Sequence, residues 1–362
     1  VDTILNRHHP DGIPPANHVT PPSLDAAVPS YLLNRIVEHV VDRDEGSHQE
    51  MLGVIYPNLI LQSAGSGRTL IVHHGHYVEP LYHFISDLRR WIYPDRAMPE
   101  TVDQLEAENF AWIDFVWSLL GRSGNAGSDV EHFFKMLRYP KHVDRVFGRI
   151  AERLASAQDI PLIPGDWLEQ RSIKGALDWI GRRMSGDRCN CDTSFGDEIH
   201  RGLSEYLFGP TYQQVRSEFG EIPADLSFAF GHTHKPFTSE IMDPESGQTI
   251  ALYNSGGWTV DSSTPRPVAG GAVLLASEGL ELVSIRIYDE PDDGSKVGTA
   301  YLADPTAAAV ARGQLDFRRE IERRMITASE AEHATWVSLA RSIEDGIRAR
   351  RAMHRKQWGT PE

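Results

Sequence analysis

The sequence is poor in cysteine, in positive charge and in long apolar runs, and each shortage excludes a class of protein. Its 362 residues contain only two cysteines, Cys189 and Cys191. Cysteines separated by a single residue do not suit a structural disulfide, and no Cys/His set with zinc-finger spacing surrounds them. We therefore interpret them as loop thiols and expect a protein of a reducing compartment, the cytoplasm.

Basic residues are outnumbered by acidic ones. The chain carries 36 Lys and Arg against 51 Asp and Glu, a formal net charge of −15. Binding to a nucleic-acid backbone depends on Lys and Arg, so this balance disfavours nucleic acid as a partner. An anionic substrate is still compatible with it, because bound divalent cations reverse the potential locally.

No apolar stretch reaches the ~20 residues that a bilayer-spanning helix needs. The most apolar predicted helix begins near Thr101, and from residue 110 to residue 120 it is apolar nearly all round. We interpret it as an internal helix of a cap subdomain. The alternative is a peripheral contact with a membrane surface or a lipid-like substrate.

Two histidine motifs follow predicted strands that lie far apart in the chain. The apolar, aromatic residues 227–230 predict a short buried strand, and Gly-His-Thr-His follows at residues 231–234. Residues 69–73 predict a second strand, which runs into His-Gly-His at residues 74–76. Imidazole is the commonest protein metal ligand, and α/β proteins bind ligands outside the carboxyl ends of their strands. We interpret both motifs as parts of one metal site, with exposed histidine-bearing loops as the alternative.

A third predicted strand, residues 249–254, ends in Asn254 followed by small residues. Together the three stretches resemble the calcineurin-like metallophosphoesterase family, whose later motifs are His-Gly-His, Gly-His-x-His and a closing Asn-x-Gly turn. The resemblance covers roughly residues 15–80 and 222–290. It implies an α/β fold built as a four-layer α/β/β/α sandwich. It also implies hydrolysis of a phosphomonoester or phosphodiester by a water that two divalent metal ions activate, with Mn favoured over Fe or Zn.

The metal ligands follow from the resemblance, motif by motif. His74, His232 and Asn17 would hold one ion, and His234 would hold the other. Histidine and Asn ligands keep the positive charge of the metal pair high, which suits an anionic substrate. The substrate would be a phosphorylated small molecule or a lipid-like phosphoester.

Further site residues are implied by the same resemblance. Residues 15–19 stand where the family has Gly-Asn-His-Asp, and they depart from it at two positions; the alternative is a Pro-flanked loop. His18 would donate to a phosphoryl oxygen or protonate the leaving group. His76 and Asn254 would orient neighbouring groups or touch the substrate.

The family's two early motifs, Asp-x-His and Gly-Asp-x-x-Asp, are not found before residue 68. We expect them upstream of Val1. If they are truly absent, the alternative is a non-catalytic interaction or scaffold module on the same fold. A nuclease is a second alternative, which the net charge disfavours.

The chain divides into four predicted regions. Residues 1–80 form the first part of the core, which we expect to be incomplete at its start, and residues 81–221 form a helical insertion that we expect to act as a cap. Residues 222–290 form the second part of the core and carry Gly-His-Thr-His. Residues 291–362 are an acidic linker followed by charged helices, through which the chain could form a homo-oligomer.

Overall fold

The computed structural model describes residue 19 and residues 55–78, 80–92, 95, 97–114, 195–257, 268–289, 301–327 and 330–358. The predictions for Asn17 and His18 and for most of the insertion concern residues outside these ranges. So do those for the two cysteines. The sequence also predicts a helix at residues 30–41, which lies outside them too.

A five-stranded mixed sheet forms the centre of the molecule, with the order β1-β2-β3-β5-β4. Its strands are β1 (Asn58–Gln62), β2 (Thr69–His73), β3 (Leu226–Phe230), β4 (Phe237–Met242) and β5 (Thr249–Asn254). The three inner strands β2, β3 and β5 are parallel, and β1 and β4 add antiparallel edges. The carboxyl ends of β2, β3 and β5 therefore meet at one edge of the sheet, as the motif positions predict.

The inner strands are buried on both faces, which is why they are apolar at nearly every position. Ile71, Phe228 and Leu252 are 0% exposed and point to one face. Leu70 and Ala229 point to the other face, where they pack with Leu274 and its neighbours from a second sheet.

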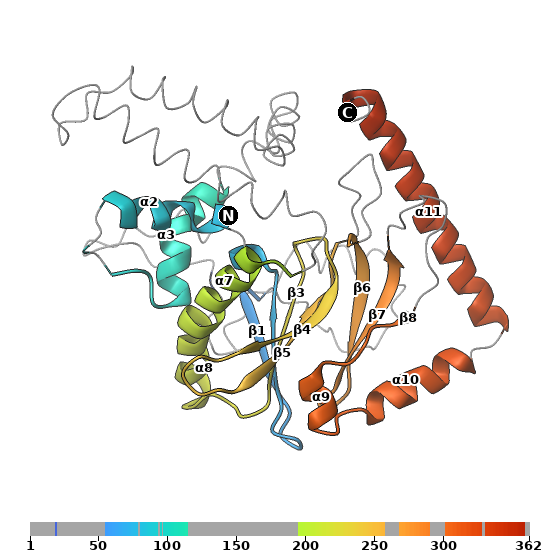
Figure 1. Cartoon of the computed structure of the whole chain (residues 1–362), viewed down its shortest axis with the longest axis horizontal. Helices are drawn as coiled ribbons and strands as arrows, with labels where there is room; N and C mark the ends of the chain where they lie inside the picture. Colours follow the sequence, from blue (N-terminus) through green and yellow to red (C-terminus); the bar gives the residue numbers. More distant parts are fainter. Residues whose placement is uncertain are drawn as a thin grey trace, which may run out of the picture.

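Helices cover the first face of the sheet (Figure 1). They are η2 (His76–Val78), η3 (Pro80–His83), α3 (Val102–Asp114), α7 (Asp197–Tyr206), the wide π-helical turn η5 (Leu207–Thr211) and α8 (Tyr212–Phe219). A further helix, α2 (Phe84–Ile92), packs against α3 and η3. The sequence predicts that the helix from residue 198 ends at residue 208. The structure instead continues through α8, because the wide turn accommodates Pro210, which has no N–H for a regular helical bond.

The second sheet is antiparallel and is followed by three helices. Its strands are β6 (Gly270–Ala276), β7 (Leu282–Asp289) and β8 (Tyr301–Leu302), and the helices are α9 (Ala307–Ala311), α10 (Asp316–Ile326) and α11 (Glu330–Trp358). Val283, Ile285 and Ile287 of β7 pack against apolar side chains of α10. No described helix is both long and apolar enough to cross a bilayer. The α/β class is thus confirmed, with one mixed and one antiparallel sheet.

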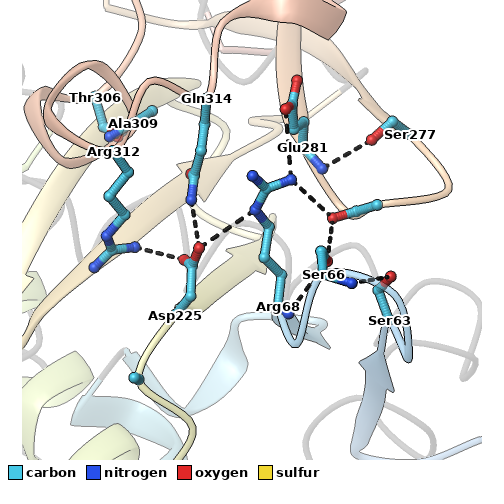
Figure 2. A network of polar contacts seen from close by, with 12 residues as sticks. Ser63, Ser66, Arg68, Asp225, Ser277, Glu281, Thr306, Ala309, Arg312 and Gln314 are labelled. Atoms are coloured by element: carbon cyan, nitrogen blue, oxygen red, sulfur yellow. Dashed lines mark hydrogen bonds and ion pairs between the residues drawn. The ribbon is translucent and has the colours of Figure 1, made fainter.

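A polar network joins the first sheet to the segment after β8 (Figure 2). Asp225 accepts from Arg312 at 2.5 Å, forms an ion pair with Arg68 at 3.3 Å, and also accepts from Gln314. Arg68 in turn reaches Glu281, whose other oxygen accepts the backbone N–H of Phe317 near the start of α10. The network fixes the α9–α10 segment against the edge of the sheet opposite the histidine motifs.

Candidate metal centre

The carboxyl ends of β2, β3 and β5 enclose a cleft of about 410 Å³. Three of the predicted site histidines, His74, His232 and His234, line it. Val72 and Leu274 add an apolar wall where the two sheets diverge. The cleft thus lies in the crevice outside the strand ends, where α/β proteins bind ligands.

His74 and His232 are in direct contact, although they come from motifs far apart in the sequence. Their ring centroids are 4.8 Å apart, and the rings meet edge to face. The backbone carbonyl of His74 accepts the N–H of Gly231 at 3.1 Å, so the parallel ladder of β2 and β3 continues to the histidines. Tyr82, at the start of the insertion, packs its ring 5.1 Å from that of His232.

The Gly-His-Thr-His loop has an unusual backbone. Both His232 and His234 adopt positive φ, 68° and 58°, which L-residues rarely do. Such conformations cost of order 1–3 kcal/mol each and persist where the surrounding structure imposes them. Both histidines line the cleft, whereas the hydroxyl of Thr233 between them accepts a hydrogen bond from Asn254.

Two glycines allow the motif loops to approach each other. At Gly75, φ is +108°, and a Cβ there would lie 2.7 Å from the carbonyl oxygen of Gly231. At Gly257, a Cβ would lie 2.2 Å from the His234 ring. Any larger residue at either position would displace a histidine motif.

Asn254 links the end of β5 to the Gly-His-Thr-His loop. It is 0% exposed, its side-chain amide donates to the Thr233 hydroxyl, and its carbonyl oxygen accepts the N–H of Gly256. Of the two predicted roles, orienting neighbouring groups is the one this geometry fits.

His73 and His76 are each only 3% exposed; His73 contributes to the lining of the cleft, and His76 lies behind it. Nδ1 of His73 accepts the N–H of Gly75 at 2.9 Å, and burial lowers the pKa of His73 well below its usual value. Burial likewise lowers the pKa of His76, against an opposing influence of Glu106. The ring centroids of His76 and His74 are 5.5 Å apart, so His76 contacts a cleft histidine although it does not itself line the cleft.

Sequence reasoning missed the groups that surround His76. Glu106 of α3 is 0% exposed, and its carboxylate lies 3.7 Å from Nε2 of His76. The Tyr56 hydroxyl bonds the same nitrogen at 3.2 Å. Burial, and then the Glu106 carboxylate, raise the pKa values of Tyr56 and Tyr77. The available signal was the buried stripe of α3, residues 102, 105, 106 and 109, which carries a Glu and an Asn among apolar side chains.

The imidazoles match the ligands that first-row divalent ions prefer. Within the described ranges, no group of three or more His, Cys, Asp or Glu is placed so that it could hold a metal ion. A full coordination sphere needs further donors, and Asn17 lies outside those ranges. Comparison of the chain with protein-family models, curated proteins and solved structures gives no match.

Proposed function

We propose that the cleft is the active site of a metal-dependent phosphoesterase of the calcineurin-like type. The observation that carries the proposal is the contact between His74 and His232, together with His234 on the wall of the same cleft. Motifs that the chain separates widely converge on one crevice, and a histidine of each lines it.

The order of layers supports the four-layer sandwich that we propose as the fold. One apolar cluster joins α7 and α8 to the mixed sheet, and a second joins that sheet to β6 and β7. A third joins β7 to α10. The succession is helices, sheet, sheet and helix.

Each site residue has a separate task in this proposal. His74 and His232, with Asn17, would hold one divalent ion, and His234 would hold the second. When bound, the ion pair would activate a water and neutralise the phosphoryl oxygens. His18 would protonate the leaving group or contact the phosphoryl oxygen. Asn254 and Gly75 keep the loops in register, so that the imidazoles need little rearrangement on binding.

The decisive experiment measures metal binding and hydrolysis on the same protein. Chelator-treated protein is titrated with Mn²⁺ by calorimetry and assayed on an aryl phosphate monoester and diester. We expect saturable Mn²⁺ binding and Mn²⁺-dependent turnover. His232→Ala should lower both on the order of a hundredfold or more without unfolding the protein, since losing even outer-shell groups costs 10–100-fold.

His200→Ala is the matched control, because His200 is exposed on α7 and has no motif role. It should behave like the parent protein. Unchanged turnover in His232→Ala would refute the assignment. Mn²⁺ binding without turnover of either ester, or neither property, would favour the non-catalytic module; turnover restricted to nucleic acid would favour the nuclease.

A further inference from the structure

Glu106 is a fully buried carboxylate in a position that the fold alone does not require. It comes from α3, within the predicted insertion, and is 0% exposed beneath the cleft. A buried carboxylate carries a desolvation penalty of several kcal/mol unless donors surround it. An apolar side chain of similar size would fit the stripe of α3 without that penalty.

The groups around Glu106 form a directed chain toward the cleft. The Tyr56 hydroxyl hydrogen-bonds the carboxylate and also contacts Nε2 of His76 at 3.2 Å. The Tyr56 ring stacks on the His76 ring with the planes 11° apart. The His76 ring then lies 5.5 Å from that of His74, a cleft residue.

Two further tyrosines lie near the carboxylate. Tyr77 is 0% exposed and its ring lies 4.2 Å from that of His76, and Tyr206 stacks on Tyr77 at 5.1 Å. The Glu106 charge affects both rings. Among the described residues, the Tyr56 hydroxyl and the imidazole of His76 are polar groups that lie close to the carboxylate.

We propose that Glu106 is the positioning residue of His76, fixing the Nε2–H tautomer and the ring orientation so that His76 supports His74 from behind. The proposal rests on the proposed function. The carboxylate lies 3.7 Å from Nε2, too far for a hydrogen bond, so it acts through the Tyr56 hydroxyl, which hydrogen-bonds both Glu106 and Nε2. When that hydroxyl donates to the carboxylate, its oxygen accepts from Nε2–H, and this sets which ring nitrogen carries the proton. It also makes the placement of α3, and hence of the insertion, a condition for a correctly built cleft.

The test replaces Glu106 with Met, which has similar volume and no comparable acceptor. In Glu106→Met we expect kcat on the aryl phosphate to fall at least about tenfold and Mn²⁺ affinity to fall about 10–100-fold. KM should change less than about threefold, since Glu106 does not line the cleft. Glu106→Gln keeps an acceptor oxygen and should recover part of the loss. Glu108→Met, on the same helix but paired with Arg89, is the matched control.

A second readout depends on neither metal nor turnover. The ¹⁵N chemical shifts of the His76 ring are measured by NMR in metal-free protein with labelled histidine, and the His76 signals are identified because they disappear in His76→Gln. They should show Nε2 protonated and Nδ1 unprotonated. Glu106→Met should shift them toward a mixture of tautomers. Tyr56→Phe keeps the stacked ring and should also shift His76 toward a mixture of tautomers. It provides the test if Glu106→Met does not fold.

Unchanged His76 nitrogen shifts in Glu106→Met or Tyr56→Phe would overturn the proposal. So would parental kcat and Mn²⁺ affinity in Glu106→Met when the parent is active. If the parent neither binds Mn²⁺ nor hydrolyses the esters, the function fails, and the nitrogen shifts still decide the role of Glu106.

Discussion

The side-chain amide of Asn254 donates to the hydroxyl of Thr233 at 2.6 Å, across the gap between the ends of β5 and β3. Its carbonyl oxygen accepts the N–H of Gly256 at 2.7 Å. One buried amide thereby holds two loops that border the cleft. Thr233 lies between His232 and His234, so this contact bears directly on the strained part of the site.

Asn254→Ala should therefore lower both stability and metal affinity. It leaves the Gly256 N–H and the Thr233 hydroxyl without this partner, which costs about 2 kcal/mol or more of unfolding free energy. Urea unfolding and Mn²⁺ calorimetry measure the two effects. Gln248→Ala is the control: its amide bonds the carbonyls of Pro223 and Ala224 far from the cleft, so it should affect stability only.

Gly75→Ala should be far more disruptive than Gly67→Ala. Both glycines have positive φ, but a Cβ at Gly67 meets nothing within 4 Å, whereas at Gly75 it meets the Gly231 carbonyl. For Gly67, whose φ of +69° lies in the left-handed region, the backbone strain of an L-residue is about 1–2 kcal/mol, and at φ +108° the strain at Gly75 is no smaller. The clash should add about 1–3 kcal/mol and push the His74 loop away from His232. Equal losses of unfolding free energy in the two variants would contradict this account of Gly75.

The tyrosines beside Glu106 predict a loss of stability at alkaline pH. Burial raises the pKa of Tyr206 above its usual value of about 10. The unfolded chain therefore releases a proton that the folded chain keeps. The contribution of Tyr206 to the free energy of unfolding is therefore fully present below pH 10. As the pH rises above 10, the free energy of unfolding falls by about 1.4 kcal/mol per pH unit for this one tyrosine.

Tyr206→Phe tests that contribution. The variant should be less stable near pH 8 by about 1 kcal/mol, because it loses the hydrogen bond to Asn58. Above pH 10 its unfolding free energy should fall less steeply than that of the parent. The unfolding free energies of parent and variant are measured with urea between pH 8 and 11. If the two fall in parallel, the pKa of Tyr206 is the same in the folded and unfolded chain, which would contradict this prediction.

Asp225→Ala should detach the α9–α10 segment in part. Asp225 is about a quarter exposed and takes contacts from Arg68, Arg312 and Gln314 (Figure 2). Because solvent screens the site, we expect a loss of about 1–2 kcal/mol, shrinking at high salt. Asp316→Ala removes an exposed pair with Arg319 and should change stability by less than about 0.5 kcal/mol. Faster backbone amide exchange in α10 would locate the effect.

The strands were predictable because their signals are local. The predicted ranges Thr69–His73 and Thr249–Asn254 are strands to the residue, since each apolar run ends in a loop that contains Gly. The same logic failed at Pro210, where a proline predicts a helix end and the chain instead forms a wide turn between α7 and α8. Tertiary packing of α7 and α8 against the sheet overrides the local preference.

The cleft was predictable only in outline. Its histidines sit at strand ends that a parallel sheet must bring together, and that rule needs no long-range information. The partners of those histidines come from elsewhere: Tyr82 packs on His232 from the insertion, and Glu106 reaches His76 from α3. Which face of α3 is buried, and over what, depends on the docking of the whole helix. No spacing within the chain encodes it.

The pairing of β2 with β3 also has a consequence for folding. These adjacent parallel strands are separated by about 150 residues of chain. His74 after β2 can therefore meet His232 and His234 only once β3 has docked beside β2. Closing so long a loop is slow, and the nearby β1–β2 hairpin can form long before it. Under the proposed function, metal binding would accordingly be among the last events of refolding.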